Sequence, residues 1–273
     1  MTRMTGMTHM FRRIWGMMYR HLALYSRSWP RLLELAYWPV LNMCIWGFTS
    51  RFLAMRMGGN PALMAGATLL GGVLLWEVTL RSQMGMSVSF LEEMWSRNLG
   101  HVFVSPLRPF EMLLALFGMS VLRMLAGVAP AILLAWALYA FNLFTLGPVL
   151  VLFFINLMVM GWAVALAVVS LILRHGAGAE PLAWATLFGF APFSAVFYPV
   201  AVLPTALQWV ALALPSAHVF EGMRAIISDG VVRWDHLAAA VALNIVWMAG
   251  AALLFARQFR AARESGALIS IGE

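Results

Sequence analysis

Long apolar runs separated by short polar turns make up most of the chain. Several runs reach the roughly 20 residues that a helix needs to cross a lipid bilayer. The runs do not alternate in polarity, as the strands of a membrane barrel do. The pattern predicts an all-α integral membrane protein, one transmembrane domain over residues 1–273 with six spanning helices. The predicted spans are residues 32–53, 62–84, 112–144, 146–173, 182–203 and 237–255.

A segment with two distinct helical faces precedes the first predicted span. One face is apolar, and arginines recur every seven residues on another. The two sets are Phe11, Ile14, Met18, Leu22 and Tyr25, and Arg13, Arg20 and Arg27. This predicts an amphipathic helix over residues 11–29 that lies in the membrane interface with its arginines toward lipid phosphates. Pro30 is expected to end it, because the residue before a proline avoids the helical region. The alternative is a cytosolic helix packed on a partner.

The most polar internal stretch is residues 87–109, between the second and third predicted spans. Ser89 and Glu92 have the spacing of a capping box, which satisfies the free N–H groups at a helix start. Gly100 can adopt the left-handed conformation that closes a helix. The stretch therefore predicts a short cytosolic helix of about ten residues, which is too short to cross a bilayer.

A second unusual segment lies between the fifth and sixth predicted spans, over residues 204–230. Pro204 and Pro215 enclose an apolar run that is too short to span the membrane. It predicts a re-entrant hairpin, which is tolerated only where protein or water satisfies its backbone. Ser216 is then expected to begin a helix that ends near Gly230.

Composition excludes several classes of protein. Of the 273 residues, 63% are hydrophobic and 11% are charged, against roughly 25% charged in a soluble domain. All 18 basic residues are arginine, so the chain has neither the lysine of a nucleotide-binding P-loop nor a Schiff-base lysine. Cys44 is the one cysteine, which excludes an internal disulfide and a cysteine-based zinc site. We expect no catalytic, cofactor-binding or metal-binding residues in this chain.

The arginines divide unequally between the two sides of the six-span topology. Thirteen fall on the side of both termini and four on the other, with Arg123 left in a span. Because cytoplasmic loops carry the excess of positive residues, both termini and the 87–109 segment are predicted to be cytoplasmic.

Ionisable residues inside a bilayer usually face the interior of the helix bundle. Glu77 and Arg81 have the i, i+4 spacing of a local ion pair. Glu77 with Arg123 is the second possibility. The alternative to these structural pairs is a role of Glu77, Arg81 and Arg123 in a substrate path.

Two local motifs and the order of the elements resemble the membrane-spanning permease of type-2 ABC exporters. Ser105-Pro-Leu-Arg-Pro109 resembles the loop after that family's coupling helix, and the stretch from Pro215 to Arg224 resembles the segment after its re-entrant hairpin. The interfacial helix, six spans, coupling helix and re-entrant segment also occur in the family's order.

The resemblance implies a bacterial inner-membrane efflux subunit that is not an enzyme. Two permeases, as a homodimer, would assemble with two separate ATPase subunits that bind ATP and magnesium. The 89–100 helix would couple to the ATPase, with Trp95 as the anchor and Glu92, Glu93 and Arg97 as rim ion pairs. A solvated helix without a partner is the alternative for these charges.

The resemblance does not select one substrate class, and it indicates only candidate residues for a gate. Glycan, lipid and drug exporters share this architecture, so a hydrophobic, amphipathic or glycan-type substrate is expected without a choice between them. The candidate residues of an extracytoplasmic gate are Phe197, Tyr198, Glu221 and Arg224. The alternative functions are an ion-coupled secondary transporter that uses Glu77 and Arg123 and a membrane-embedded enzyme, for which the acidic residues are too dispersed.

Overall fold

The computed structural model describes residues 2–57 and 59–264, and the regular secondary structure of this part of the chain is all helical, which confirms the predicted all-α class. The α-helices are α1 (Thr2–Ser26), α2 (Trp29–Met57), α3 (Gly59–Trp95), α4 (Leu99–Val104), α5 (Pro109–Tyr139), α6 (Val149–His175), α7 (Leu182–Phe190), α8 (Thr205–Leu212), α9 (Pro215–Asp229) and α10 (Trp234–Glu264). Short 3₁₀ turns occur after α5, α6 and α7 and before α8.

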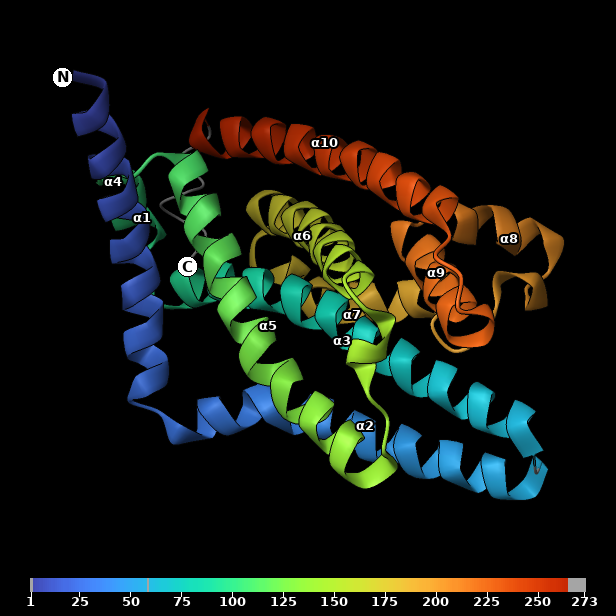
Figure 1. Cartoon of the computed structure of the whole chain (residues 1–273). Coiled ribbons are helices and arrows are strands. Elements are labelled where there is room, and N and C mark those ends of the chain that lie inside the picture. Colours follow the sequence, from blue (N-terminus) through green and yellow to red (C-terminus); the bar gives the residue numbers. More distant parts are fainter. Residues whose placement is uncertain (1, 58, 265–273) are drawn as a thin grey trace.

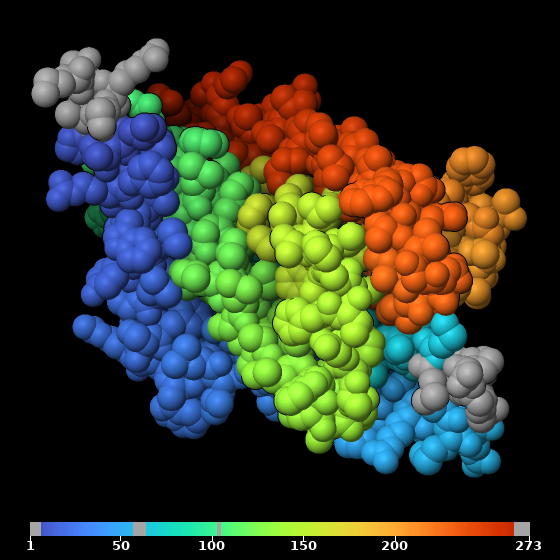
Figure 2. All heavy atoms as spheres, in the orientation of Figure 1, coloured from blue at the N-terminus to red at the C-terminus, as the bar shows by residue number. Residues whose placement is uncertain are grey.

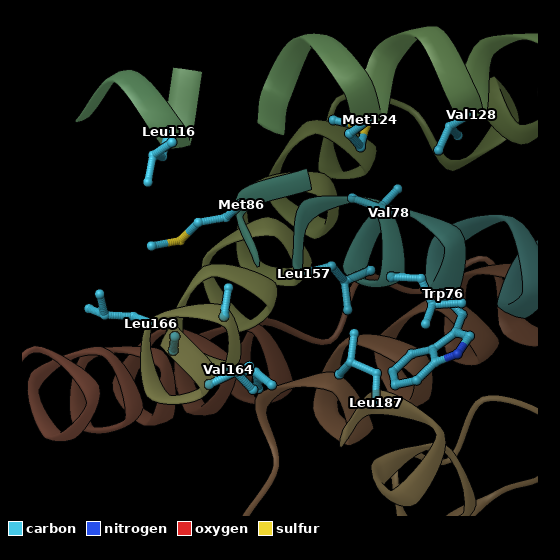
Figure 3. Packing of buried hydrophobic residues seen from close by; sticks show 14 of the residues in the cluster. Trp76, Val78, Met86, Leu116, Met124, Val128, Leu157, Val164, Leu166 and Leu187 are labelled. Atoms are coloured by element: carbon cyan, nitrogen blue, oxygen red, sulfur yellow. The ribbon is translucent and has the colours of Figure 1, made fainter. Parts of the chain in front are cut away.

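Helix α3 is the centre of the bundle. Residues 71–80 are all buried, and the helix contacts α2, α5, α6, α7 and α9. Figure 3 shows this core, in which apolar side chains of α3 meet those of α5, α6 and α7. The labelled side chains from these helices include Trp76, Val78, Met86, Leu116, Met124, Val128, Leu157 and Leu187. The apolar part of α3 is thus packed in the core, and this packing fixes the position of its polar last turns, which end at Trp95.

The two ends of the bundle differ in the elements that cover them. Helices α1 and α4 lie at one end, and α8, α9, the last turn of α2 and the first turn of α3 lie at the other (Figure 1). Helix α1 runs across its end of the bundle and contacts α5 and α2. In the space-filling view it forms a ridge along one edge of the molecule, beside α5 (Figure 2).

Three helices in the described part of the chain, α5, α6 and α10, are long and apolar enough to cross a membrane. Helices α8 and α9 together form a fourth candidate that is bent by 97°, which is the geometry of a broken span or a re-entrant loop. Helices α2 and α3 are 29 and 37 residues long but have polar residues in their interiors, such as Asn42 and Glu77. The structure thus supports a multi-pass bundle, and the six-span topology stays a prediction.

Several helix ends differ from the predicted ones. Helix α1 ends at Ser26, and Pro30 lies in the first turn of α2, where its missing N–H leaves no hydrogen bond unmade. Helix α5 ends at Tyr139, before the predicted residue 144, because Ala140 adopts a left-handed conformation with φ of 52°. The predicted fifth span is not one helix: α7 ends at Phe190, and a 3₁₀ turn over Ala191–Phe193 and an irregular segment follow it. Pro192 has no N–H to donate to a continuing α-helix.

The predicted helix start at Ser89 is wrong. The Ser89 hydroxyl donates to the carbonyl of Gly85 (2.8 Å) inside α3, which continues without interruption to Trp95. Arg97, with φ of 52°, provides the left-handed residue that was expected at Gly100, and Gly100 lies within α4. The short helix between α3 and α5 is therefore the six-residue α4.

The end of α3 follows the Schellman pattern. The Arg97 N–H donates to the Met94 carbonyl, and the Asn98 N–H donates to the Glu93 carbonyl, both at 2.9 Å. The Asn98 side chain also donates to the Glu93 carboxylate at 2.6 Å. These bonds hold the turn between α3 and α4 in one conformation.

Candidate functional site

Helix α1 is joined to the end of α3 and the start of α5 by buried carboxylates. Arg20 donates to Glu93 at 2.9 Å, and the Arg13 Nε donates to Glu111 at 2.9 Å. Only 1% of the Glu93 side chain and 2% of the Glu111 side chain are exposed. Arg13 and Arg20, which are expected to face lipid phosphates, thus donate hydrogen bonds to acidic side chains of neighbouring helices.

His21 lies at the centre of this junction and is fully buried. Its Nδ1 is 3.2 Å from an oxygen of Glu92, and its Nε2 is 3.4 Å from an oxygen of Glu93. One ring from α1 thus contacts both adjacent carboxylates of α3. We refer to Arg13, Arg20, His21, Glu92, Glu93, Glu111 and Arg123 as the α1 junction.

Arg123 of α5 completes the α1 junction. Its guanidinium donates to Glu92 at 2.8 Å and to the carbonyl of Gly85 at 3.3 Å, and it lies over the ring of Tyr25 at 4.5 Å. Arg123 therefore pairs with Glu92, and the possible pair with Glu77 is not formed. Burial alone would raise the pKa of Glu92, but the hydrogen bond with His21 and the charge of Arg123 outweigh burial and place this pKa below its ordinary value.

Glu77 forms the local pair that its spacing indicates. It is 1% exposed, and it accepts hydrogen bonds from Arg81 at 3.2 Å and from Asn42 of α2 at 2.7 Å. The charge in the middle of α3 is thus neutralised within the bundle, as expected for an ionisable residue at membrane depth.

Trp95 and Arg97, two of the four residues expected to contact an ATPase, are exposed at the end of α3. Trp95 is 50% exposed, donates to Glu180 at 3.2 Å and stacks with Trp184 at 6.5 Å between ring centroids. Beside this end, α1, α4 and the following loop enclose a surface groove of about 360 Å³. Its lining includes Arg13, Arg20, Asn98, His101 and Pro106. The other two expected contact residues, Glu92 and Glu93, point into the α1 junction.

At the opposite end of the bundle, the four candidate gate residues fix the course of the segment after α7, through contacts with α9, with α2 and within the segment itself. Glu221 accepts a hydrogen bond from the Val200 N–H at 2.7 Å, and Arg224 donates to the carbonyls of Ala195 and Tyr198. Tyr198 donates to the Pro192 carbonyl at 2.6 Å, and Phe197 stacks on Trp46 of α2 at 4.7 Å. These contacts satisfy the backbone of an irregular segment, which the interior of a membrane protein requires.

Sequence reasoning did not identify His21, Asn98 and Glu111 as members of these networks. His21 and Glu111 join segments that are distant in the chain, as in the pair of Arg13 with Glu111, and no local spacing indicates such contacts. Asn98 bonds to Glu93, five residues earlier, through the turn that ends α3. The one sequence signal for these ion pairs is the seven-residue spacing of the α1 arginines, which the sequence analysis interprets as contact with lipid phosphates.

The described residues thus form a bundle with at least three helices that could cross a membrane and with ion pairs gathered at one end, which defines a multi-pass helical membrane protein. A family comparison agrees, because residues 59–256 match the model of the ABC-2 family transporter protein. The chain belongs to this family. It is therefore a membrane permease domain, which lacks a nucleotide-binding domain, and membership implies an ATPase partner. A comparison with curated proteins gives no match.

Proposed function

We propose that this chain is the permease of an ATP-driven exporter and that the end of the bundle with α1 and α4 receives the ATPase. The family match is the observation that carries the proposal. It also sets aside the alternative of an ion-coupled carrier based on Glu77 and Arg123. Two copies of the chain would form a homodimer in the inner membrane with both termini cytoplasmic and would assemble with two ATPases.

The proposed docking surface consists of Trp95, Arg97 and α4. An exposed tryptophan at a helix end is typical of interface hot spots. Glu92 and Glu93 have a different part in this proposal: they connect the docking surface to α1 and α5 through buried ion pairs. A push on the end of α3 would thus move α1 and α5 together with it.

Six spans are proposed from α2, α3, α5, α6, α10 and the α7 segment, with α8 and α9 as the re-entrant pair. Helix α3, with 37 residues at about 1.5 Å per residue, is longer than the roughly 30 Å hydrocarbon layer. Its polar last turns would extend beyond the membrane to the ATPase. Phe197, Tyr198, Glu221 and Arg224 are proposed as the gate at the other end. Glu221 and Arg224 hold the irregular segment against α9, and Phe197 packs it on α2.

Co-purification with the ATPase subunit tests this proposal. Trp95→Ala is expected to reduce the ATPase recovered with the tagged permease by about tenfold, because it removes the exposed anchor. Trp209→Ala, which removes a tryptophan on α8 that is 73% exposed, is the control and should leave recovery unchanged. Equal recovery with both variants would contradict docking at the α3 end.

A further inference from the structure

A cavity of about 250 Å³ lies beside the α1 junction, where the end of α1, the start of α2, α3, α5 and α7 meet. Its lining combines three arginines, Arg31, Arg81 and Arg123, with aromatic and aliphatic side chains. The arginines come from α2, α3 and α5, so their guanidinium groups approach the cavity from different directions.

Arg123 retains hydrogen-bonding capacity that the described residues do not use. Its side chain is 3% exposed, and its Nε is buried without a hydrogen-bond partner. A buried donor without a partner costs about 1–3 kcal/mol, so such a group in a native structure indicates a missing partner.

The other two arginines also keep free donors. Each guanidinium has five N–H groups, and the described bonds of Arg81 use only its Nε, which donates to Glu77. Arg31 lies 3.9 Å from Glu92 and is 45% exposed, at the open side of the cavity. Three forked donors around one small space match an acceptor with several oxygens.

Two carboxylates also line the cavity, and their positions limit the ligand. Glu92 already accepts hydrogen bonds within the α1 junction, whereas Glu34 is exposed. Arg81 is further balanced by Glu77. The cavity therefore has no large excess of positive charge, and the argument depends on unused donors rather than on net charge.

The remaining walls are apolar or aromatic. Leu35, Met84 and Val88 supply aliphatic surface, and Trp95 and Trp184 supply aromatic surface. The volume is below the roughly 300–1,000 Å³ of pockets that enclose a drug-sized ligand. The cavity thus has room for a polar headgroup, whereas the rest of an amphipathic ligand would extend outside it.

We propose that this cavity binds the phosphoryl group of an amphipathic molecule. Tetrahedral phosphoryl oxygens accept hydrogen bonds from several directions, whereas a carboxylate presents two oxygens in one plane. The inference rests on the proposed export function in one respect, which is that the bound molecule is taken to be an exported substrate. Binding itself is a property of this chain and is measured without the ATPase.

Titration of the purified chain with phosphatidic acid, followed by native mass spectrometry, tests the inference. Diacylglycerol with the same acyl chains is the matched ligand, because it lacks only the phosphoryl group. Wild type is expected to bind one phosphatidic acid saturably and more tightly than diacylglycerol. Arg31→Gln should weaken binding about tenfold, the effect of one charged hydrogen bond. Arg27→Gln, an exposed arginine outside the cavity lining, should have no effect.

A cavity-filling variant, Val88→Phe, keeps all three arginines and is expected to abolish saturable binding while the chain elutes as wild type does. Inorganic phosphate distinguishes the sources of the group. Displacement of phosphatidic acid by inorganic phosphate would point to a soluble phosphoryl compound, and absence of displacement would point to a lipid-linked one. Equal affinity for diacylglycerol, or equal losses in Arg31→Gln and Arg27→Gln, would overturn the inference and leave ATPase docking untouched.

Discussion

Glu92 lies where α1, α3 and α5 meet, and each neighbour contributes a group to it. His21 approaches from α1 and Arg123 from α5. Breaking a buried ion pair by removing one partner typically costs 3–5 kcal/mol, because the other charge is left uncompensated. The carboxylate therefore has a structural role that is separate from any contact with another subunit.

The lowered pKa of Glu92 predicts a dependence of stability on pH. Because the folded-state pKa lies below the unfolded value of 4.5, the stabilisation is fully present above pH 4.5 and is lost as pH falls through the folded value. Glu92→Gln should lower the free energy of unfolding by about 3 kcal/mol at pH 7. Its difference from wild type should shrink below pH 4.5.

Thermal unfolding in detergent across this pH range measures the effect. Glu34→Gln is the matched control, because Glu34 is exposed at the open side of the neighbouring cavity. A Glu92→Gln difference that stays constant down to pH 3 would contradict the ion-pair account.

Residue spacing predicted the pair of Glu77 with Arg81 but not that of Glu92 with Arg123. Glu77 and Arg81 are one helical turn apart, so the i, i+4 rule was sufficient. Arg123 and Glu92 lie on different helices, and their contact depends on how α5 crosses α3. No pattern within either helix contains that information.

At the scale of elements, α3 shows how a local signal can be overridden. The S-x-x-E spacing at Ser89 predicted a helix start, but the hydroxyl bonds back to Gly85 and the helix continues. No glycine or proline lies between Met86 and Trp95 to stop it. The apolar runs were therefore a better guide to the existence of helices than the polar motifs were to their ends.

The close approach of the segment after α7 to α3 depends on Gly72. A Cβ at this position would lie 2.5 Å from the backbone oxygen of Val196, which cannot move away as a flexible side chain could. Gly72→Ala should therefore destabilise the fold by about 1–3 kcal/mol. Gly250→Ala in α10, where a Cβ meets no atom within 4 Å, should be neutral or stabilising by up to about 1 kcal/mol.

Unfolding temperatures of the two alanine variants provide this comparison. Gly72→Ala is expected to unfold at a lower temperature than both wild type and Gly250→Ala. Equal unfolding temperatures would show that the segment after α7 does not pack on α3 as described.

The two ends of the whole molecule differ: α1, α4 and the α1 junction lie at one end, and the α8–α9 pair lies at the other (Figure 1). The unequal division of arginines predicted two different ends, and the all-helical class followed from the apolar runs. The sequence analysis predicted a span over residues 182–203 and not the broken course after α7, because contacts with α9 and α2 determine that path.

The most direct test of an ATP-driven permease is the rate of ATP hydrolysis by the ATPase subunit in lipid vesicles with and without this chain. Our account predicts that wild type raises the rate at least severalfold and that Trp95→Ala removes most of this increase. It also predicts that Trp209→Ala retains the increase. A hydrolysis rate that is the same with and without the chain would contradict the account.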